Sequence, residues 1–465
     1  MILRQLAGLL WNVFYLSSLL LAAPWLFWRY LRYGKNRRGW AQKLWGLVPD
    51  PAKDVVAGGA AAPGQGEPSR ARKCIWLHAV SVGEVNLLAP IIERLQRELP
   101  GVRLVVSTTT ETGYDLALNK YPSLVVFFFP FDFTWSVRQA LQRIKPSLIV
   151  LAELEIWPNF IHGASHFPVA GNGTLRPSIP IAIVNGRLSE KSFRGYRRFR
   201  FLLSSSFKRL SLVAAQDQVY ADRFIRLGAD PATVHVTGSV KFDGVCTDRN
   251  NDLTNRLRSL TDFTPQEFVW LAGSTQLEED LLAAEIYQEL RHQYPQLRLV
   301  LAPRHPERCA DLVARLESRG LELTRRSLLS PDHLMGQVAR QGSSILLVDV
   351  LGELGGWWGI ADAAYVGGSL GSRGGQNMIE PAAYGLPLSF GPQTQNFRAI
   401  VEQLLAVDGA VVIADKKELR AFVERCLNDR AWATQMGLRA QSMVSRHRGA
   451  ADRTVQLLRE QLQSP

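Results

Sequence analysis

Short apolar runs alternate with longer amphipathic stretches along the first half of the chain. The strand candidates are CIWLHAV (74–80), VRLVVSTTT (102–110), LVVFFFP (124–130), SLIVLAEL (147–154), IPIAIVN (179–185) and LSLVAAQ (210–216). Helical patterns, VNLLAPIIERLQREL (85–99) and SVRQALQRIK (136–145), lie between some of them. Alternation of this kind predicts a parallel sheet whose strands are connected by crossover helices.

A second series of the same kind begins after about residue 250. Its strand candidates are FVWLAGS (268–274), LRLVLAP (297–303), SSILLVD (343–349), DAAYVGG (362–368) and LPLSFGP (386–392), with the helical pattern EEDLLAAEIYQELRHQY (278–294) between the first two. The polar stretch TDRNNDLTN (247–255) joins the two series. We therefore expect two Rossmann-like domains facing a cleft, with ligands bound beyond the carboxyl ends of the strands.

The N-terminus carries the longest apolar run, QLAGLLWNVFYLSSLLLAAPWLFW (5–28), followed at once by basic residues. As a helix it would be about 36 Å long, enough to cross a hydrocarbon core of about 30 Å. The basic flank predicts an anchor that leaves the rest of the chain in the cytoplasm. A cleaved signal peptide is the alternative, but it would need positive charge before the run, where only Arg4 stands. Pro24 leaves open whether the segment spans the membrane or is partly embedded.

These patterns divide the chain into four parts. We expect a membrane anchor with its basic flank at 1–49, a flexible linker at 50–73, an N-terminal Rossmann-like domain at 74–250, and a C-terminal Rossmann-like domain with terminal helices at 251–465. The linker assignment rests on its alanine, glycine and proline content and its lack of apolar periodicity.

Charge and cysteine content narrow the functional classes. The 465 residues carry a net charge of +12, which suits a polyanion: a nucleic acid, an anionic membrane or a phosphorylated substrate. The basic residues are dispersed and match no nucleic-acid-binding motif, so we expect no nucleic-acid partner. The four cysteines are far apart, and the sequence has neither paired Cys/His ligands nor a DxD motif. We expect no metal site and no cofactor.

In the second half, the glycine-rich segment GGSLGSRGGQNMIEPAAYG (367–385) leads from a strand into a helix. It matches neither GxGxxG nor the phosphate loop GxxxxGK[ST]. Glu380 is placed to bind ribose hydroxyls, although a turn without a ligand remains the alternative. Arg304 follows another strand and suits a phosphate or carboxylate, or is a solvated basic turn. Gly352 and Glu353 stand at a third strand-to-helix junction, where Glu353 taken alone is an ordinary helix-start carboxylate.

In the first half, Glu84, Glu153 and Glu155 follow strand candidates and are possible bases. Each has a structural alternative. Ser81 and Glu84 have capping-box spacing, and the other two can be carboxylates of a strand terminus. Lys241, in TGSVKFD (237–243), offers a cation facing the same cleft or is a surface lysine.

Nine segments, taken in order, resemble the family of 3-deoxy-D-manno-octulosonic acid (Kdo) transferases of lipopolysaccharide synthesis. They are HAVSVGE, STTTETG, ELEIWPN, VNGRLSEKSFRGY, AAQDQVYADRFIRLGA, VTGSVKFD, APRHPER, LGELGGWWGIADAAYVGGSL and RGGQNMIEPAAYGLP, between about residues 75 and 400. The resemblance implies a GT-B glycosyltransferase fold with an N-terminal acceptor domain and a C-terminal donor domain. It further implies the donor CMP-Kdo, a phosphorylated lipid A precursor as acceptor, and a place on the cytoplasmic face of the inner membrane.

The family's site residues carry over to matching positions of this chain. The general base falls on Glu84, and the transition-state stabilisers fall on Glu153 and Lys241. The CMP-binding positions fall on Pro303, Arg304, Leu351, Gly352, Glu353, Asn377, Met378, Ile379 and Glu380.

This chain departs from the family pattern at two places. It has Gln276 and Leu277 where the family has the HE of STHEGE, and Gln376 where the family has the histidine of RGGHN. Both changes remove an imidazole near the expected donor.

The expected reaction is an inverting transfer of Kdo from CMP-Kdo with release of CMP. A single displacement needs one base for the acceptor hydroxyl and a positive group for the leaving phosphate, and the candidate residues supply both. The alternatives are another GT-B lipid glycosyltransferase that uses a UDP-sugar, and a non-catalytic, membrane-tethered protein that binds a nucleotide-sugar.

Overall fold

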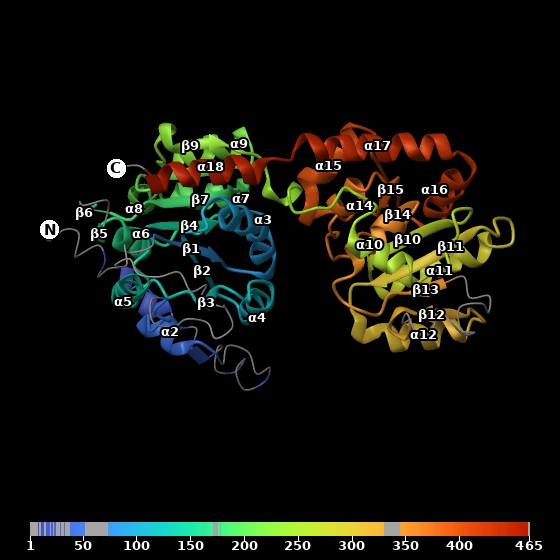
Figure 1. The fold of residues 1–465 in the computed structure, drawn as a ribbon, viewed down its shortest axis with the longest axis horizontal. Helices are drawn as coiled ribbons and strands as arrows, with labels where there is room; N and C mark the ends of the chain where they lie inside the picture. The colour runs from blue at the N-terminus through green and yellow to red at the C-terminus, as the bar shows by residue number, and fades with distance from the viewer. Residues whose placement is uncertain are drawn as a thin grey trace, which may run out of the picture. The chain divides into compact units, whose positions relative to one another are not determined.

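The protein has two compact α/β units. The computed structural model describes residues 38–51, 73–170, 175–176, 178–329 and 345–463, together with single positions and short runs between Gly8 and Arg32. One unit contains residues 1–244 and 448–465, and the other contains residues 245–447. Each is built on a seven-stranded parallel sheet (Figure 1). The expected pair of Rossmann-like domains is confirmed.

The sheet of the first unit follows the strand candidates closely. Its strands, in spatial order, are β3 (Val125–Phe128), β2 (Arg103–Thr108), β1 (Cys74–Ala79), β4 (Leu148–Ala152), β7 (Ile181–Gly186), β8 (Leu212–Ala215) and β9 (Val234–Val236). Burial on both faces explains why these strands are apolar without interruption. A separate antiparallel pair joins β5 (Val169–Ala170) to β6 (Leu175–Arg176).

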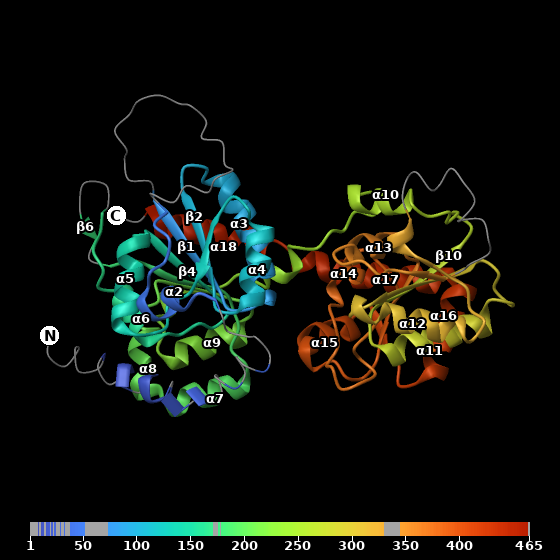
Figure 2. The ribbon, with the colours of Figure 1, turned by 90° about the horizontal axis from the view of Figure 1, so that it is seen from below.

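Helices cover both faces of this sheet: in Figure 2, α3 and α4 lie on one side of the strands and α5 and α6 on the other. Ile75 and Leu77 face a core closed by α3 and α18, whereas Trp76 faces a core closed by α5 and α6. The alternation follows from the two-residue period of a strand. The helices are α2 (Trp40–Trp45), α3 (Val82–Glu98), α4 (Glu111–Lys120), α5 (Thr134–Ile144), α6 (Pro158–Ala164), α7 (Glu190–Arg198), α8 (Arg200–Phe207), α9 (Gln218–Leu227) and α18 (Ala450–Gln463).

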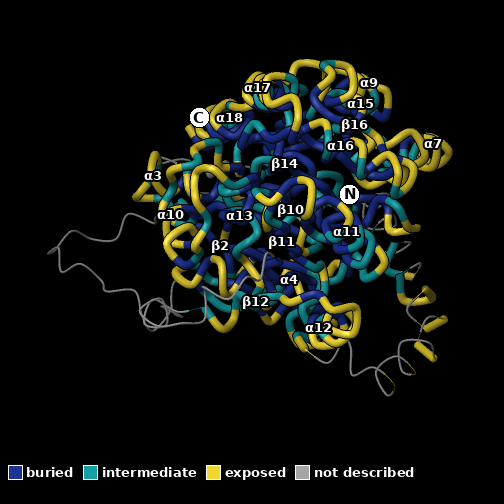
Figure 3. The backbone as a smooth tube through the Cα atoms, turned by 90° about the vertical axis from the view of Figure 1, so that its right-hand side faces the viewer, coloured by how far each residue is buried: buried dark blue, intermediate teal, exposed yellow. Residues whose placement is uncertain are grey.

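The sheet of the second unit has a similar plan. Its strands, in spatial order, are β12 (Leu323–Arg325), β13 (Ile345–Leu347), β11 (Leu297–Pro303), β10 (Phe268–Thr275), β14 (Ala363–Val366), β15 (Leu388–Phe390) and β16 (Ala410–Val412). Figure 3 shows β10, β11 and β14 as buried and α12 as largely exposed.

Bulky side chains fill both sides of the second sheet. Trp270 packs with Tyr287, Leu312 and Phe422 on one side. On the other side the Trp358 ring lies so close to Gly273 that a Cβ there would come within 2.5 Å of it, so this position requires glycine. The helices are α10 (Asp252–Arg258), α11 (Leu277–Leu290), α12 (Cys309–Glu317), α13 (Leu354–Ile360), α14 (Ile379–Ala383), α15 (Arg398–Ala406), α16 (Lys416–Asn428) and α17 (Arg430–Arg446).

Two of the expected part boundaries differ from the structure. The unit boundary lies at Gly244, and the second half of the stretch expected to join the domains is helix α10. The terminal helix α18, expected in the C-terminal domain, belongs to the first unit (Figure 1). It does so because its apolar face, which includes Val455 and Leu458, completes the core under α3.

The end of the expected basic flank is also part of the first unit. Helix α2 packs on α5, where Ser136 Oγ donates to the carbonyl of Lys43 at 2.9 Å and Arg143 Nε donates to that of Val48 at 2.6 Å. Lys43, expected beside the membrane, is buried with its ammonium over the Phe128 ring, and burial lowers the pKa of Lys43.

Eleven of the 24 residues of the expected anchor at 5–28, and nearly all of the linker at 50–73, lie outside the described residues. Of the described positions, Asn12 donates from Nδ2 to Thr134 Oγ1 at 2.8 Å, and Tyr15 packs edge-on against Phe133. In the part of the chain that the structure describes, none of the helices has the length and apolar character needed to cross a bilayer.

Leu458→Ala tests the place of α18 in the first unit. Leu458 is fully buried, so the substitution should lower the free energy of unfolding of this unit by about 2–4 kcal/mol. Urea titrations followed by hydrogen exchange separate the units, because β1 peptides report on the first and β10 peptides on the second. Loss of protection in β10 alone would contradict the assignment, and the exposed Arg459→Ala is the control.

Candidate active site

The first sheet reverses its strand order between β1 and β4, which lie side by side. From β1 the chain continues to β2 and β3 on one side, and from β4 it continues to β7 and β8 on the other. Such a switch point leaves a crevice beyond the carboxyl ends of the two strands. Glu84 follows β1, and Glu153 and Glu155 follow β4, so three of the predicted side chains stand at this edge.

Glu84 lies in the first turn of α3 and is half-buried. Its Oε2 accepts a hydrogen bond from the backbone N–H of Val80 at 2.8 Å, and Ser81 Oγ donates to Oε1 at 3.4 Å. Ser81 makes no side-chain cap of α3, so the alternative of a reciprocal capping box is wrong. Burial raises the pKa of Glu84 and the Glu153 charge adds to this, against the opposing effects of the Val80 N–H and Lys241.

Glu153 and Lys241 form an ion pair beside Glu84. Lys241 lies in a 3₁₀ turn, η2 (Val240–Phe242), and its Nζ is 3.4 Å from Glu153 Oε1. Glu153 has a positive φ of 55°, which is rare for a residue with a side chain. Such strain persists where the surrounding structure holds it, most often at functional sites.

Glu155 completes the group. Burial raises its carboxyl pKa from 4.5 to about 7, helped by the charges of Glu84 and Glu153, while a hydrogen bond from Trp157 Nε1 at 2.8 Å opposes the rise. The structure therefore brings together one ammonium and three carboxyl groups. One of the three holds a proton close to neutral pH.

Two residues that support this site carry no motif of their own. Asn185, at the end of β7 with a φ of 54°, accepts a hydrogen bond at Oδ1 from Val240 N at 3.0 Å and so holds the turn that carries Lys241. The buried Asp132 accepts from the N–H groups of Asn159 at 3.0 Å and Phe160 at 2.7 Å, which fixes the start of α6 after Glu155. Asn185 ends a predicted strand, and this position is the sequence feature from which its place near the site could have been predicted.

In the second unit, the predicted donor residues lie toward one edge of the sheet. Pro303 ends β11 and Arg304 follows it, Leu351 to Glu353 lie between β13 and α13, and Asn377 to Glu380 enter α14 after β14. The strands are parallel, so their carboxyl ends meet at this edge.

The side chains of these residues play different parts. Arg304 and Leu351 are exposed, whereas Met378 and Ile379 are buried and belong to the core. Glu353 is held by Arg326 through two hydrogen bonds of 2.8 Å, so its carboxylate is already paired. Glu353 is the N-cap residue of α13, but its side chain makes no capping hydrogen bond there.

Asn377 and Glu380 act together at the start of α14. Asn377 donates from Nδ2 to Glu380 Oε1 at 2.9 Å and accepts at Oδ1 from Ile379 N at 3.1 Å. Burial raises the pKa of Glu380, and the Asn377 hydrogen bond opposes the rise.

The departures from the family pattern also lie in the second unit. Gln276 precedes α11 and, with Pro303 and His305, lines a cavity of about 10 Å³, room for one water molecule. Gln376 lies against Gly368: a Cβ added to Gly368 would come within 3.1 Å of Gln376 Nε2. Among the residues that the structure describes, no group of three or more His, Cys, Asp or Glu side chains is arranged to hold a metal ion.

Known proteins similar to this chain identify its family. A family profile described as 3-deoxy-D-manno-octulosonic-acid transferase matches residues 58–244. The 3-deoxy-D-manno-octulosonic acid transferase of Haemophilus influenzae is 31% identical over 392 residues, which are 84% of this chain and 87% of that protein. The chain belongs to the Kdo transferase family. The enzyme of the same name from Chlamydia muridarum is 26% identical and is matched over 99% of this chain and 98% of its own length.

Solved structures show the fold. A glycosyltransferase from Rickettsia africae has a TM-score of 0.54 at 10% identity, over 85% of this chain and all of that one. The UDP-GlcNAc 2-epimerase from Neisseria meningitidis has a TM-score of 0.53 at 12% identity, over 83% of this chain and all of that one. With two parallel α/β units, the predicted GT-B fold is confirmed, and family membership makes the protein a glycosyltransferase. The alternatives of a UDP-sugar enzyme and of a non-catalytic binding protein are not favoured.

Glu155→Gln should change how stability depends on pH. Below pH 4.5 the Glu155 carboxyl is protonated in both the folded and the unfolded chain. As pH rises to about 7, the unfolded chain releases this proton and the folded chain keeps it, so the free energy of unfolding falls. Glutamine keeps an oxygen for the Trp157 indole and does not titrate. The variant should therefore gain on the order of 2 kcal/mol relative to the natural protein across this window.

Urea denaturation at pH 4.5, 6 and 7.5 measures this difference. The exposed Glu322→Gln is the control and should show the same difference from the natural protein at each pH. A constant difference for Glu155→Gln would show that Glu155 titrates normally.

Proposed function

We propose that this Kdo transferase moves Kdo from CMP-Kdo onto a phosphorylated lipid A precursor at the cytoplasmic face of the inner membrane, with Glu84 as the general base. The observation that carries the proposal is the group of Glu84, Glu153 and Lys241 at the switch point of the first sheet. The sugar is proposed from the names of the relatives, and the catalytic roles are proposed from the residues of this group.

In this mechanism the acceptor hydroxyl attacks the anomeric carbon of Kdo, and the bond from that carbon to the phosphate oxygen of CMP breaks. The hydroxyl proton passes to the Glu84 carboxylate. A carboxyl group whose pKa is raised by burial is a better base than an ordinary one, provided that it remains ionised at the working pH. The Val80 N–H and the Lys241 ammonium both favour that ionised form.

Glu153 and Lys241 stabilise the transition state as a pair. As CMP leaves, negative charge builds on its phosphate, and a fixed ammonium lowers the energy of that charge. The ion pair with Glu153 and the Asn185 bond to Val240 N restrict where the ammonium can lie. Because the Lys241 ammonium is already held in place, it does not have to reorganise during the reaction.

The second unit binds CMP in this proposal. Arg304 is the exposed cation for the phosphate, and Glu380, held by Asn377, is the acceptor for ribose hydroxyls. Glu353 contributes indirectly, because its pairing with Arg326 fixes the turn at Leu351 and Gly352. No step in this scheme requires a metal ion.

Glu84→Gln should lower turnover by roughly 10²–10⁴-fold, the usual contribution of a positioned base. An amide cannot take the acceptor's proton, but its oxygen can still accept the Val80 N–H bond, so the loss of stability should stay below about 1 kcal/mol. Turnover is measured by mass spectrometry of a lipid A precursor incubated with CMP-Kdo, and CMP binding by calorimetry should be unchanged.

Glu93→Gln is the matched control, since Glu93 is an exposed glutamate on the same helix. It should leave turnover and stability as they are. Near-normal turnover of Glu84→Gln would show that Glu84 has a structural role and is not the base. Glu155 would then be the next candidate to test.

A basic and aromatic ridge supports contact with an anionic membrane. The ridge comprises residues 191–202 of α7 and α8, where Phe199 is 51% exposed and Phe201 is 80% exposed. Its exposed cations are Lys191, Arg194, Arg197, Arg198 and Arg200. Exposed aromatic rings beside cations match the interface of a bilayer with anionic headgroups.

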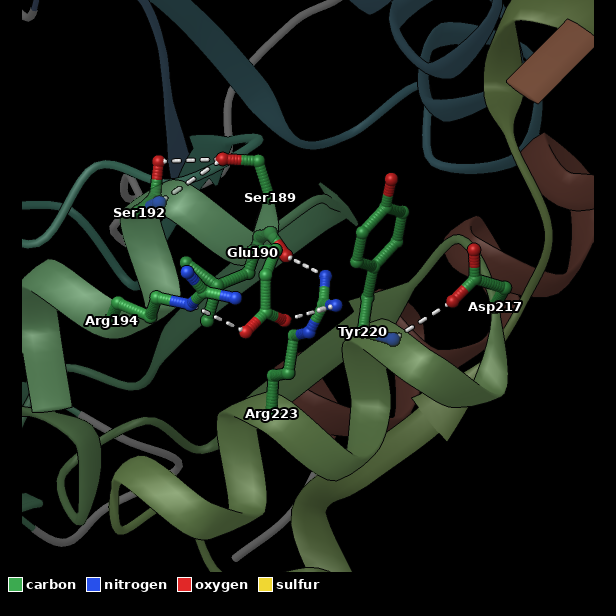
Figure 4. A network of polar contacts seen from close by, with 8 residues as sticks. Ser189, Glu190, Ser192, Arg194, Asp217, Tyr220 and Arg223 are labelled. Atoms are coloured by element: carbon green, nitrogen blue, oxygen red, sulfur yellow. Dashed lines mark hydrogen bonds and ion pairs between the residues drawn. The ribbon is translucent and has the colours of Figure 1, made fainter. Parts of the chain in front are cut away.

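The base of the ridge is held firmly. Glu190 accepts from Arg194 Nε at 3.1 Å along α7 and from Arg223 Nη2 at 2.7 Å on α9 (Figure 4). Ser189 caps α7 by accepting from Ser192 N at 3.2 Å. The cations beyond this network remain exposed, so they can meet phosphate groups of the lipid.

A fluorescent label at Phe201→Cys tests the ridge in the full chain. Cys246 is first replaced by serine, because it is the exposed cysteine of the described residues. Vesicles containing phosphatidylglycerol should shift the emission of a polarity-sensitive dye at position 201 to the blue, and high salt should weaken the shift. Leu118→Cys, an exposed apolar position on α4, is the control. Equal shifts at the two positions would contradict contact through the ridge.

A further inference from the structure

The second sheet has its own switch point, between β10 and β14. These strands lie side by side, and the chain leaves them toward opposite edges of the sheet. The turn after β14 comprises residues 367–370 and opens the glycine-rich segment. Glu279, in the first turn of α11 after β10, lies against this turn and is 3% exposed.

The Glu279 carboxylate accepts hydrogen bonds from three consecutive backbone N–H groups of the turn. Gly368 N is 2.6 Å from Oε2, while Ser369 N and Leu370 N are 3.0 and 3.1 Å from Oε1. Tyr365 Oη also donates to Oε1 at 2.8 Å, and Gln276 N donates to Oε2 at 2.8 Å. Five donors therefore satisfy one buried carboxylate, which is the condition for burying such a charge.

Successive backbone N–H groups that converge in this way form an anion-binding concavity, and in many proteins the anion is a phosphate. Here the chain's own carboxylate fills the concavity. The fit needs glycine, because a Cβ at Gly367 would stand 2.8 Å from Glu279 Oε2, and Gly368 has a φ of +66°. The glycines of this turn thus allow the backbone to fit closely around the Glu279 carboxylate.

Further hydrogen bonds connect the turn to the predicted donor residues. Gly375 N donates to the carbonyl of Gly368 at 2.7 Å, which ties the return of the loop to its start. Ser369 Oγ donates to Val366 O at 2.6 Å and accepts from Gly391 N at 2.8 Å. The loop that closes at Gly375 continues directly into Asn377 and Glu380.

We propose that Glu279 is a positioning residue for the donor site: its carboxylate sets the conformation of the 367–370 turn and thereby places Asn377 to Glu380. This rests on the proposed role of those residues in binding CMP. A consequence is that the N–H groups of the turn are not ligands of the donor phosphate, which is bound by side chains instead.

Glu279→Gln tests the proposal. An amide NH₂ would face backbone N–H groups, so the turn should lose its conformation while the size of the side chain stays the same. We expect CMP affinity to fall at least tenfold and the KM for CMP-Kdo to rise, with the KM for the acceptor unchanged. Hydrogen exchange should quicken at Gly368, Ser369 and Leu370. Glu278→Gln, the exposed neighbour, is the matched control.

Glu279→Ala adds a readout that a general loss of stability would not give. Acetate fits the space left by the side chain, so tens of millimolar acetate should restore CMP binding, whereas neutral acetamide should not. If this variant does not fold, Glu279→Gln decides alone. Unchanged CMP affinity in Glu279→Gln, or failure of acetate to restore binding in a folded Glu279→Ala, would overturn the proposal. If these binding results hold but the natural protein transfers no Kdo, the proposed function fails and the positioning role stands.

Discussion

The pairing of β1 with β4, and of β10 with β14, is the constraint on which both predicted sites depend. At each pair the chain leaves in opposite directions, so the carboxyl ends of the strands are not covered by their own connections. Backbone N–H groups at such an edge lack partners in the sheet, and carboxylates from the following helices accept their bonds. Glu84 does so toward Val80 in the first unit, and Glu279 does so toward Gly368 in the second.

The two carboxylates nevertheless have different surroundings. Glu279 is buried with five donors around it, so all of its acceptor capacity is directed inward. Glu84 is half-buried with one backbone donor, and two further carboxyl groups stand near it. Desolvation and like charge then outweigh hydrogen bonding, and the pKa of Glu84 and of Glu155 rises. Glu155 can therefore exchange a proton near neutral pH.

Much of the fold could be predicted because the sheets are buried on both faces. Uninterrupted apolar runs give strong strand signals, and Leu297–Pro303 is a strand over the range expected. The three-residue edge strands β9, β12 and β16 were not predicted, because they are only partly buried, whereas the equally short β13 and β15 are fully buried within predicted apolar runs. Helix α18 could not be assigned to the first unit, because nothing local shows which core an amphipathic helix completes. For a similar reason the sequence did not show that Lys43 is buried over the Phe128 ring: a basic residue after an apolar run predicts a membrane flank, whatever it packs on.

The candidate site was predictable only in part for the same physical reason. The positions of Glu84, Glu153 and Lys241 came from strand ends and from a family resemblance, but their partners lie far along the chain. Val240 is 55 residues from Asn185, and Gly368 is 89 residues from Glu279. Spacing along a sequence carries no information about contacts of that range unless the topology is known. Glu279 matches the last residue of the STHEGE pattern, and Glu278 stands in place of its glycine, but that match did not show which groups the Glu279 carboxylate contacts.

Strained backbone conformations occur at the ends of the strands that carry the site residues. Glu153, Asn185 and Ser274 all have positive φ angles near 55°, and each stands at the carboxyl end of a strand: β4, β7 and β10. At β7 and β10 the strand register is also irregular, between Ile183 and Gly186 and between Gly273 and Thr275. A left-handed residue or a bulge there turns the following chain sharply and redirects the side chain. Each such residue costs about 1–3 kcal/mol, and the cost persists only because surrounding bonds such as Asn185 to Val240 hold the geometry. The strain marks the same sheet edges at which the carboxylates gather, and it does so independently of any assignment of their chemistry.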